Sequence, residues 1–444
     1  MSTSSMQNLD RFISLPDYVR DHILSFLSME DAAKTSVLSR QWRNSCSSLS
    51  NLKFVQKKFE GKKSGSGSFQ QRKQFRKKME FRNFVDHLLI QHDQTDIRSF
   101  DLSMCIDRIV ASDDHIKAWI LFAIVHNVQE LYLNVESGKL TYSFFTCSSL
   151  KLLSLSNLIV ELAVKIFLPN LNTLKLSYVK FCDQDVAENL FSSCPVLQYL
   201  TLKECSLIHG NTFTISASKL RHINYTGDKM PNISSETLSS LKDVTFFTYD
   251  VDKDLATYFL PDLPVYSDKG NGNVLRGLHN VETLTLGGNY IKILHTVPGS
   301  FSSRSNSCCS LKHLDLYIWP LKGHFELVID MLRAYSNLES LRITFKGSWL
   351  YKYERGLQQQ PEVLTGSLLM HLKGVEIQNF GRRDKFDLHI VRYLLENAIS
   401  LEKMKINYGN NVWKDTELRM SISEMILSYT MASSQAVIEF FGQE

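Results

Sequence analysis

The chain has 444 residues, 43% of them hydrophobic and 22% charged, with a formal net charge of +4. This composition is typical of globular proteins and excludes collagen-like and intrinsically disordered chains. Its most apolar run, Ala118 to Val125, is much shorter than the about 20 residues of a membrane-spanning helix, and the N-terminal residues lack the basic and apolar regions of a secretory signal. The eight cysteines form no C-x-x-C pair, which indicates reduced thiols. We expect a soluble intracellular protein with no membrane partner.

Residues 9–54 have the pattern of three short helices. The first is predicted by apolar residues at helical spacing, which are Leu15, Val19, Ile23, Leu24 and Leu27. Ser28, with Asp31 three residues later, and Ser39, just before Trp42, stand where helix N-caps are expected. Three helices in about 45 residues form a module near the size that requires outside support. We therefore expect this module to dock on a partner.

A basic segment follows this module. Between Lys53 and Arg82 there are eleven Lys or Arg and two Glu, a local charge of +9. Its centre, SGSGSFQQRKQ, lacks apolar periodicity and has linker composition, so we predict a flexible basic linker over residues 55–80. A nuclear-import signal and a nucleic-acid contact are the alternatives, although only three phenylalanines in the segment could stack on bases.

From residue 97 onward the motif L-x-x-L-x-L recurs twelve times, with other apolar residues in place of some leucines. The units begin at Ile97, Val128, Leu150, Leu171, Leu197, Leu220, Leu241, Val281, Leu311, Leu338, Leu372 and Leu401. The last three positions of each unit alternate apolar, polar, apolar, as in a strand with one buried face. Since no unit can bury that face alone, the units must stack, and the pattern resembles the leucine-rich repeat. We predict an α/β fold, an irregular solenoid with a parallel sheet on its concave face; a doubly wound α/β domain is the alternative.

Two segments near the start of the array have helical periodicity and are expected to cap it. Their apolar residues are Phe81, Phe84, Val85, Leu88 and Leu89 in one segment and Ile116, Trp119, Ile120, Ala123 and Ile124 in the other. Cys105, Cys205 and Asn289 occupy the Asn/Cys position of the repeat consensus, which gives these cysteines a packing role. The long interval before Val281 predicts a loop at Pro261–Gly277.

No catalytic, metal or cofactor site is predicted. Three aspartates between residues 250 and 254 begin like a calcium loop, but Leu255 and Pro261 stand where Gly and Glu are required. His87 and His92 lie five residues apart instead of the four that place two ligands on one helical face, so we expect them on a solvated helix.

The N-terminal segment LDRFISLPDYVRDHILSFLSMEDAAKTSVLSRQWRN resembles an F-box. It carries the ordered pieces LPD at Leu15, ILSFL at Ile23, AKTSVLS at Ala33 and WR at Trp42, although the NSCSSL that follows lacks the aromatic residue often found there. The segment from Pro361 to Gly409, with HLKGVEI, VRYLLENA and LEKMKI, is similar to the FBD segment of plant F-box/leucine-rich-repeat proteins. The expected domains are an F-box (9–54), the basic linker (55–80), a repeat solenoid with a helical N-terminal cap (81–359) and FBD-like C-terminal repeats with a cap (360–444).

The resemblance implies a non-catalytic substrate-recognition subunit of a Skp–cullin–F-box ubiquitin ligase, which needs no cofactor. The F-box would bind a Skp-type adaptor, and through it a cullin scaffold. The apolar residues expected to form or support the adaptor-binding surface are Leu15, Pro16, Ile23, Leu24, Leu27, Val37, Leu38 and Trp42. Such a subunit is expected in the nucleus, the cytoplasm or both.

A target protein would dock on the polar positions between the strand leucines of the concave face. The selected residues are Tyr132, Lys175, Lys203, Asp315, Tyr317, Arg342 and Glu376. They carry both charge signs, so we favour a polypeptide over a polyanion, with the tyrosines and Arg342 as anchors. The alternatives are target docking on the long loops, a repeat scaffold outside any ligase, and a nucleic-acid binder that uses the basic segment.

Overall fold

The computed structural model describes residues 15–57, 68–105, 113–141, 146–161, 166–210, 212–227, 231–247, 277–287, 290–291, 310–318, 322–346, 369–381 and 386–442. These residues form two compact units, and the boundary falls within strand β7 (Tyr199–Lys203). The N-terminal unit contains the chain up to residue 201 and residues 205–213, and the C-terminal unit contains residues 202–204 and the chain from 214. The predicted loop before Gly277, the three aspartates of the rejected calcium loop and Asn289 lie outside the described residues.

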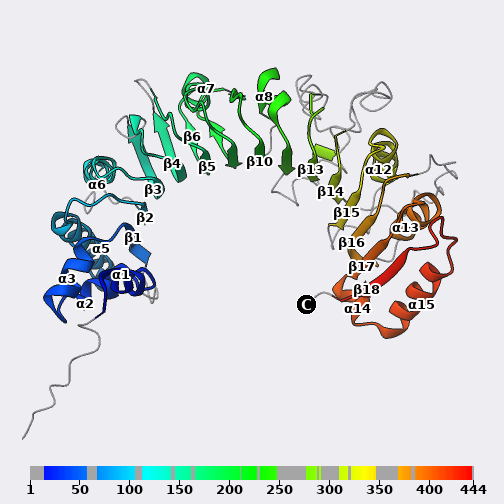
Figure 1. Ribbon diagram of the computed structural model, residues 1–444, viewed down its shortest axis with the longest axis horizontal. Helices are drawn as coiled ribbons and strands as arrows, with labels where there is room; N and C mark the ends of the chain where they lie inside the picture. The colour runs from blue at the N-terminus through cyan, green and yellow to red at the C-terminus, as the bar shows by residue number, and fades with distance from the viewer. Residues whose placement is uncertain are drawn as a thin grey trace, which may run out of the picture. The chain divides into compact units, whose positions relative to one another are not determined.

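Three helices begin the N-terminal unit, as the sequence predicted. They are α1 (Asp17–Ser25), α2 (Met29–Thr35) and α3 (Arg40–Ser47) (Figure 1). Both predicted N-caps are confirmed: the Ser28 hydroxyl accepts from the Asp31 amide at 3.2 Å, and the Ser39 hydroxyl accepts from the Trp42 amide at 3.3 Å. Each cap satisfies a backbone donor that the helix itself leaves unpaired.

The rest of the N-terminal unit is a parallel sheet with helices between its strands. The strands are β1 (Asn51–Val55), β2 (Ser99–Cys105), β3 (Glu130–Thr141), β4 (Leu152–Glu161), β5 (Thr173–Ser177), β6 (Lys180–Phe181) and β8 (Ser206–Leu207). The helices are α5 (Ser68–Gln91), α6 (Asp113–Val125) and α7 (Gln184–Ser192). Strands β1 to β5 pair in chain order, and β6 pairs with both β4 and β8.

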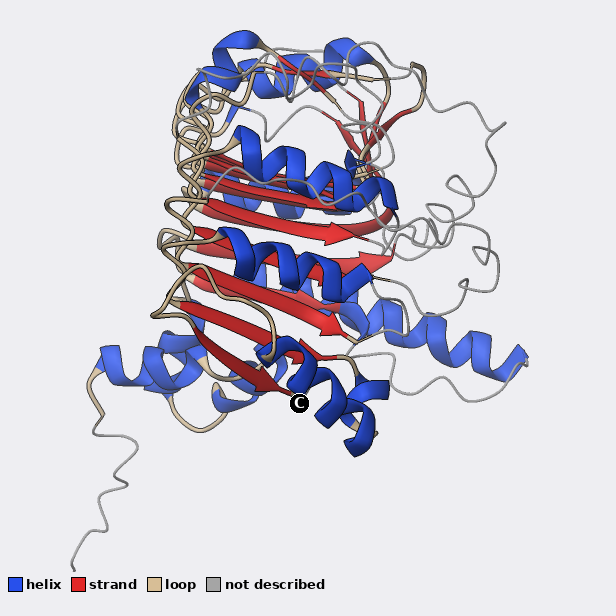
Figure 2. Ribbon diagram, turned by 90° about the vertical axis from the view of Figure 1, so that its right-hand side faces the viewer, coloured by secondary structure: helices blue, strands red, loops and turns tan. Residues whose placement is uncertain are grey.

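The C-terminal unit repeats this plan. Its strands are β9 (Thr214–Ile215), β10 (His222–Thr226), β11 (Asn232–Ile233), β12 (Asp243–Phe247), β13 (Thr283–Gly287), β14 (His313–Ile318), β15 (Ser340–Phe345), β16 (Gly374–Phe380), β17 (Lys403–Tyr408) and β18 (Val437–Phe441). Its helices are α8 (Ser235–Ser240), α12 (Lys322–Ala334), α13 (Phe386–Asn397), α14 (Asn410–Trp413) and α15 (Thr416–Leu427). Strands β10 and β12 to β18 form one parallel sheet in chain order, and β9 pairs with β11. Figure 2 shows these strands pointing the same way, with the helices α12 and α13 along one face.

Every predicted repeat unit contains a strand that begins two residues after the first apolar residue of the unit. The repeat prediction is therefore confirmed. The inward residues of successive strands pair in register, for example Leu102 with Leu133 and Leu133 with Leu155. These leucines are at most 1% exposed, and full burial of such a side chain contributes about 1.5–3 kcal/mol. The buried leucine ladder therefore holds the parallel strands together.

The start of the array differs from the prediction. Strand β1 precedes α5 and strand β2 precedes α6, so both helices connect strands of the sheet instead of capping it. Residues 68–80 of the expected linker form the first half of α5. The second half of the helix packs Phe81, Val85 and Leu89 into the unit, and the Lys, Arg and Gln before them are good helix formers that extend it. Residues 58–67 lie outside the described residues.

Two further features of the described residues bear on the expectations. No helix among them is both long and apolar enough to cross a membrane. The six cysteines among them form no disulfide, and Cys205 is buried with its thiol donating to the Leu176 carbonyl at 3.5 Å. This contact confirms the packing role predicted for Cys205.

Candidate functional site

The helices α1 to α3 expose a set of large apolar side chains. The most exposed are Tyr18 (75%), Phe26 (76%), Val37 (81%) and Leu38 (70%). Monomeric proteins rarely leave several such groups on one small module, because each loses the free energy of burial. The F-box-like module is therefore equipped to bury these side chains against another molecule.

The residues predicted for adaptor binding divide into three groups by burial. Pro16, Leu27, Val37 and Leu38 are exposed, Leu15 and Ile23 are half-buried, and Leu24 and Trp42 are buried. The two buried residues form the interior of the module, so they support the surface without belonging to it. Tyr18 and Phe26 were missing from the predicted set. The helical period of α1 could have revealed them. Tyr18 and Phe26 lie two positions from the buried Arg20 and Leu24, and therefore on the opposite, solvent-exposed side.

Arg20 links the elements of the module from its interior. It is only 5% exposed. Its guanidinium donates to the Ser45 hydroxyl at 3.2 Å and to the Leu15 carbonyl. A buried arginine requires such partners, because an unpaired buried charge is strongly destabilising. These bonds join α1 to α3 and to the chain before α1.

Backbone hydrogen bonds join the F-box-like module to the repeat sheet. The Ser50 carbonyl accepts from the Arg98 and Ser99 amides at 2.8 and 3.0 Å, and the Ser47 carbonyl accepts from the Asp93 amide at 3.1 Å. The residues that end the F-box-like segment also form β1, which pairs with β2 over five residues. The module and the first repeats therefore form one packed body within the N-terminal unit.

Of the two histidines expected on a solvated helix, His87 is exposed on α5 as predicted, but His92 is buried at this junction. It follows the end of α5, is 7% exposed, and its Nε2 donates to the Leu49 carbonyl at 3.2 Å. The ring of His126, also buried, meets it edge to face with centroids 5.2 Å apart. His126 Nδ1 donates to the Phe122 carbonyl at 2.7 Å, and the second nitrogen of each ring is buried without a hydrogen-bond partner. Burial lowers the pKa of His92.

The open face of the C-terminal sheet carries the second candidate surface. Parallel sheets are generally covered on both faces, but here the outward side chains alternate with the buried leucines and are polar. Asp315, Arg342 and Glu376 occupy one row, since they are register partners across β14, β15 and β16. Tyr317 stands on the next row of the same face. The structure therefore brings four of the predicted target-binding residues together.

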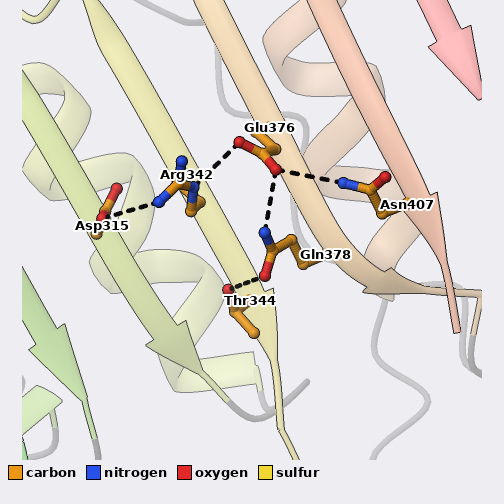
Figure 3. A network of polar contacts seen from close by, with 6 residues as sticks. All are labelled: Asp315, Arg342, Thr344, Glu376, Gln378 and Asn407. Carbon is orange, nitrogen blue, oxygen red and sulfur yellow. Dashed lines mark hydrogen bonds and ion pairs between the residues drawn. The ribbon is translucent and has the colours of Figure 1, made fainter. Parts of the chain in front are cut away.

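Arg342 is the centre of a polar network on this face (Figure 3). Its Nε donates to Glu376 at 3.1 Å, and its Nη1 donates to Asp315 at 3.5 Å. The other Glu376 oxygen accepts from Gln378 at 3.0 Å and from Asn407 at 3.3 Å. The carboxylates thus hold the guanidinium in place, so its remaining donors point in a fixed direction.

The two carboxylates of this network have opposite pKa shifts. Burial raises the pKa of Asp315, and the more distant Arg342 contact only partly opposes it. Burial by itself would also raise the pKa of Glu376, but hydrogen bonds from Gln378 and Arg342 hold that pKa below its usual value. Both shifts follow from how many donors each carboxylate receives.

An aromatic cluster lies beside the network at the ends of β12, β14 and β15. The rings of Phe247 and Tyr317 meet edge to face with centroids 5.1 Å apart, and Lys346 Nζ lies 5.0 Å from the Tyr317 centroid. Gly287 stands between the two aromatic strands, where an added Cβ would come within 2.4 Å of the Phe247 ring. Burial lowers the pKa of Lys346. The sequence pattern predicted Tyr317 for this face but not Phe247, Gly287 or Lys346.

The other predicted target residues are not part of the Arg342 network. Tyr132 and Lys175 belong to the N-terminal unit, where Tyr132 is half-buried and donates to Glu130 at 3.1 Å, and Lys175 is exposed. Lys203 lies half-buried at the end of β7. No group of three or more possible metal ligands occurs within the described ranges.

Family models match three segments of the chain. An F-box domain matches residues 12–54, the LRR repeats of FBD-associated F-box proteins match 116–259, and an FBD matches 360–406. The chain thus carries an F-box, leucine-rich repeats and an FBD, which confirms the resemblance to plant F-box/leucine-rich-repeat proteins. The FBD match covers β16, α13 and the start of β17, so this segment is one further strand–helix–strand repeat.

Relatives from Arabidopsis thaliana extend over nearly the whole chain. The FBD-associated F-box protein At1g66310 is 25% identical, with 94% of each chain covered. The F-box/FBD/LRR-repeat protein At4g00160 is 25% identical over 89% of this chain and 85% of its own. The FBD-associated F-box protein At4g10400 is 24% identical over 97% of this chain and all of its own. The similarity therefore includes the order of the F-box, repeats and FBD.

Proposed function

We propose that this protein is the substrate-recognition subunit of a Skp–cullin–F-box ubiquitin ligase. The F-box binds a Skp-type adaptor, which links the chain to a cullin scaffold, and the open strand face binds the target protein. F-box/LRR proteins typically act as such receptors and are generally non-catalytic, which supports the proposal.

One observation carries the adaptor assignment. The F-box helices expose Val37, Leu38, Tyr18 and Phe26, while Leu24, Trp42 and the paired Arg20 hold the module together from inside. The fold of the module therefore does not use the exposed apolar side chains. An adaptor groove that covers them supplies the free energy of association.

The proposed mechanism is positioning. Because β1 joins the F-box to the repeat sheet through backbone hydrogen bonds, an adaptor bound at the F-box holds the N-terminal unit with little rotational freedom. Confining a bound target close to the activated ubiquitin raises the effective concentration of its lysines. This chain then contributes geometry, and its partners contribute the chemistry.

The adaptor assignment predicts the behaviour of Val37→Asp/Leu38→Asp. Both residues are exposed, so the double variant folds like the wild type, but two carboxylates in an apolar interface carry a desolvation penalty. We expect adaptor recovered on purification to fall by at least about a hundredfold, the loss expected when two central apolar contacts are removed. The measurement is co-purification of a Skp-type adaptor with full-length chain.

The matched control is Ile90→Asp/Val125→Asp, which adds the same charge at residues of α5 and α6 that are 82% and 72% exposed. It is expected to retain the adaptor. Equal adaptor recovery with both double variants would sink the assignment and favour a repeat scaffold outside any ligase.

For the target face we propose Tyr317 and Arg342 as anchors, since Arg342 is held by two carboxylates and Tyr317 by Phe247 and Lys346. We also propose that the protein acts in the nucleus, the cytoplasm or both. A fluorescent fusion in which Lys57, Lys58, Lys62, Lys63, Arg76, Lys77 and Lys78 are changed to alanine tests the nuclear-import role of the basic segment, because an unchanged distribution would contradict that role.

A further inference from the structure

A polar pocket opens in the N-terminal unit, where β1 to β4 end against α5. Its volume is about 370 Å³, within the ~300–1,000 Å³ typical of ligand pockets. Lys57 follows β1, Gln74 and Lys78 come from α5, and Ser103 and Asn134 come from β2 and β3. The adaptor surface and the Arg342 network share none of these residues.

The wall of the pocket is built from ordered amide side chains. Asn157 Nδ2 donates to Asn134 Oδ1 at 2.8 Å, and Asn134 Nδ2 donates to the Ser103 hydroxyl at 3.4 Å. On the other side, Gln56 is 3% exposed and its Oε1 accepts from the Cys105 amide at 2.7 Å. The pocket therefore offers hydrogen-bonding groups in fixed orientations before any ligand arrives.

The backbone at this wall departs from regular strand geometry. The register of β3 and β4 shifts between Asn134 and Gly138, and Asn157 has a φ of 59°. A left-handed residue stands at the same position of other repeat units, at Tyr178, Glu204 and Asn379, and such breaks in the ladder re-aim side chains. Here the irregularity turns the Asn157 amide onto Asn134.

The charge around the pocket is positive. Its lining includes Lys57, Lys78 and Glu136, so two cations and one anion leave a net charge of +1. The same half of α5 also contains Arg72, Lys73, Arg76 and Lys77. Glu80 forms an ion pair with Arg76 at 3.4 Å. An anionic ligand is therefore attracted to α5 and to the pocket that the helix borders.

We infer that this pocket and the basic first half of α5 form a binding site for an acidic segment of polypeptide. The lysines bind its carboxylates, and the asparagine and glutamine amides bind its backbone. A nucleic acid carries a negative phosphate at every nucleotide, and Glu136 in the lining repels such closely spaced charges. A polypeptide with separated carboxylates therefore fits the pocket better. The site does not depend on the ligase role, since none of its residues belongs to the F-box helices.

The test is fluorescence anisotropy with full-length protein and a fluorescein-labelled peptide of Glu-Gly repeats. A Gln-Gly peptide of the same length controls for charge. Lys57→Gln/Lys78→Gln is expected to weaken binding by about tenfold or more, because charge-assisted hydrogen bonds are lost. The control Lys219→Gln/Lys373→Gln changes the net charge equally at exposed lysines of the C-terminal unit. Its affinity is expected to stay within about twofold, because exposed charges outside the pocket lining are screened.

A second variant tests the pocket itself. Ser103→Phe fills the space without changing any charge, so it is expected to weaken the Glu-Gly peptide as strongly as the lysine variant does. Unchanged affinity of Ser103→Phe, or of Lys57→Gln/Lys78→Gln, would overturn the inference. Tighter binding of labelled oligothymidine than of the peptide would overturn it in favour of a nucleic-acid surface. Adaptor co-purification with the same variants is expected to equal wild type, so failure here leaves the ligase proposal standing.

Discussion

The F-box and the open strand face of the C-terminal unit present opposite kinds of surface. On the F-box, polar Arg20 is buried and paired while Val37 and Leu38 are exposed. On the strand face, leucines are buried and the outward residues are half-buried polar groups bonded to one another, with Arg342 at their centre. The F-box surface leaves apolar side chains exposed, whereas the polar side chains of the strand face are already hydrogen-bonded to one another.

This difference indicates two kinds of recognition. Apolar side chains gain free energy from burial against any well-fitting groove, which suits a constant partner. A network with fixed donors and acceptors rejects a ligand that leaves one of them unpaired, which suits selective binding. The first surface is therefore matched to the adaptor of the proposed ligase, and the second to its target.

The largest expected effect is on the stability of the F-box, where substitution of a buried residue is compared with substitution of an exposed one. Trp42→Ala removes a side chain that is 4% exposed, and loss of a buried Trp costs about 3–5 kcal/mol. A module of this size cannot absorb that loss, so hydrogen exchange is expected to show residues 17–47 unprotected. Val37→Ala, at an exposed position, is expected to keep wild-type protection. Similar exchange in the two variants would contradict the division into interior and surface.

A smaller effect is expected on the strand face. Arg342→Ala removes two partly exposed ion pairs, each of which contributes about 0.2–1 kcal/mol. The free energy of unfolding is expected to fall by about 1 kcal/mol, and the pKa of Glu376 is expected to rise because it loses a donor. Denaturant unfolding and a carboxyl NMR titration measure these changes. Arg342→Lys keeps the charge but not the fork that reaches both carboxylates. If the pKa of Glu376 is the same in Arg342→Ala as in the wild type, Arg342 does not control the ionisation of this carboxylate.

The smallest expected effect concerns pH and only the N-terminal unit. Burial lowers the pKa of His92 in the folded chain, so below the unfolded value of about 6.5 the unfolded chain binds more protons. Stability therefore rises with pH in this range, and it is lost as the pH falls through about 6.5 toward the lowered folded value. Hydrogen exchange at the junction residues 47–55 and 92–99 measures the loss. His92→Gln is expected to flatten the profile, and parallel profiles of wild type and variant would contradict it.

The sequence by itself determined the strands and their inward residues. All twelve units that begin at Ile97 to Leu401 start strands, because the L-x-x-L-x-L pattern carries both the period of a strand and the need to stack. It also determined the caps Ser28 and Ser39, since an N-cap is a contact between residues three apart. Such signals are local, so one sequence is enough to read them.

Only the tertiary structure decided which residues meet across repeats. The burial of Arg20 depends on Ser45, and the burial of His92 depends on Leu49, 43 residues earlier in the chain. β1 has the alternation of a strand but not the repeat motif, so its place beside β2 could not be read from the sequence. The Phe247–Tyr317–Lys346 cluster and the pocket beside α5 combine residues from several repeats. Their positions follow from the register of the sheet, which long-range packing fixes and local pattern does not.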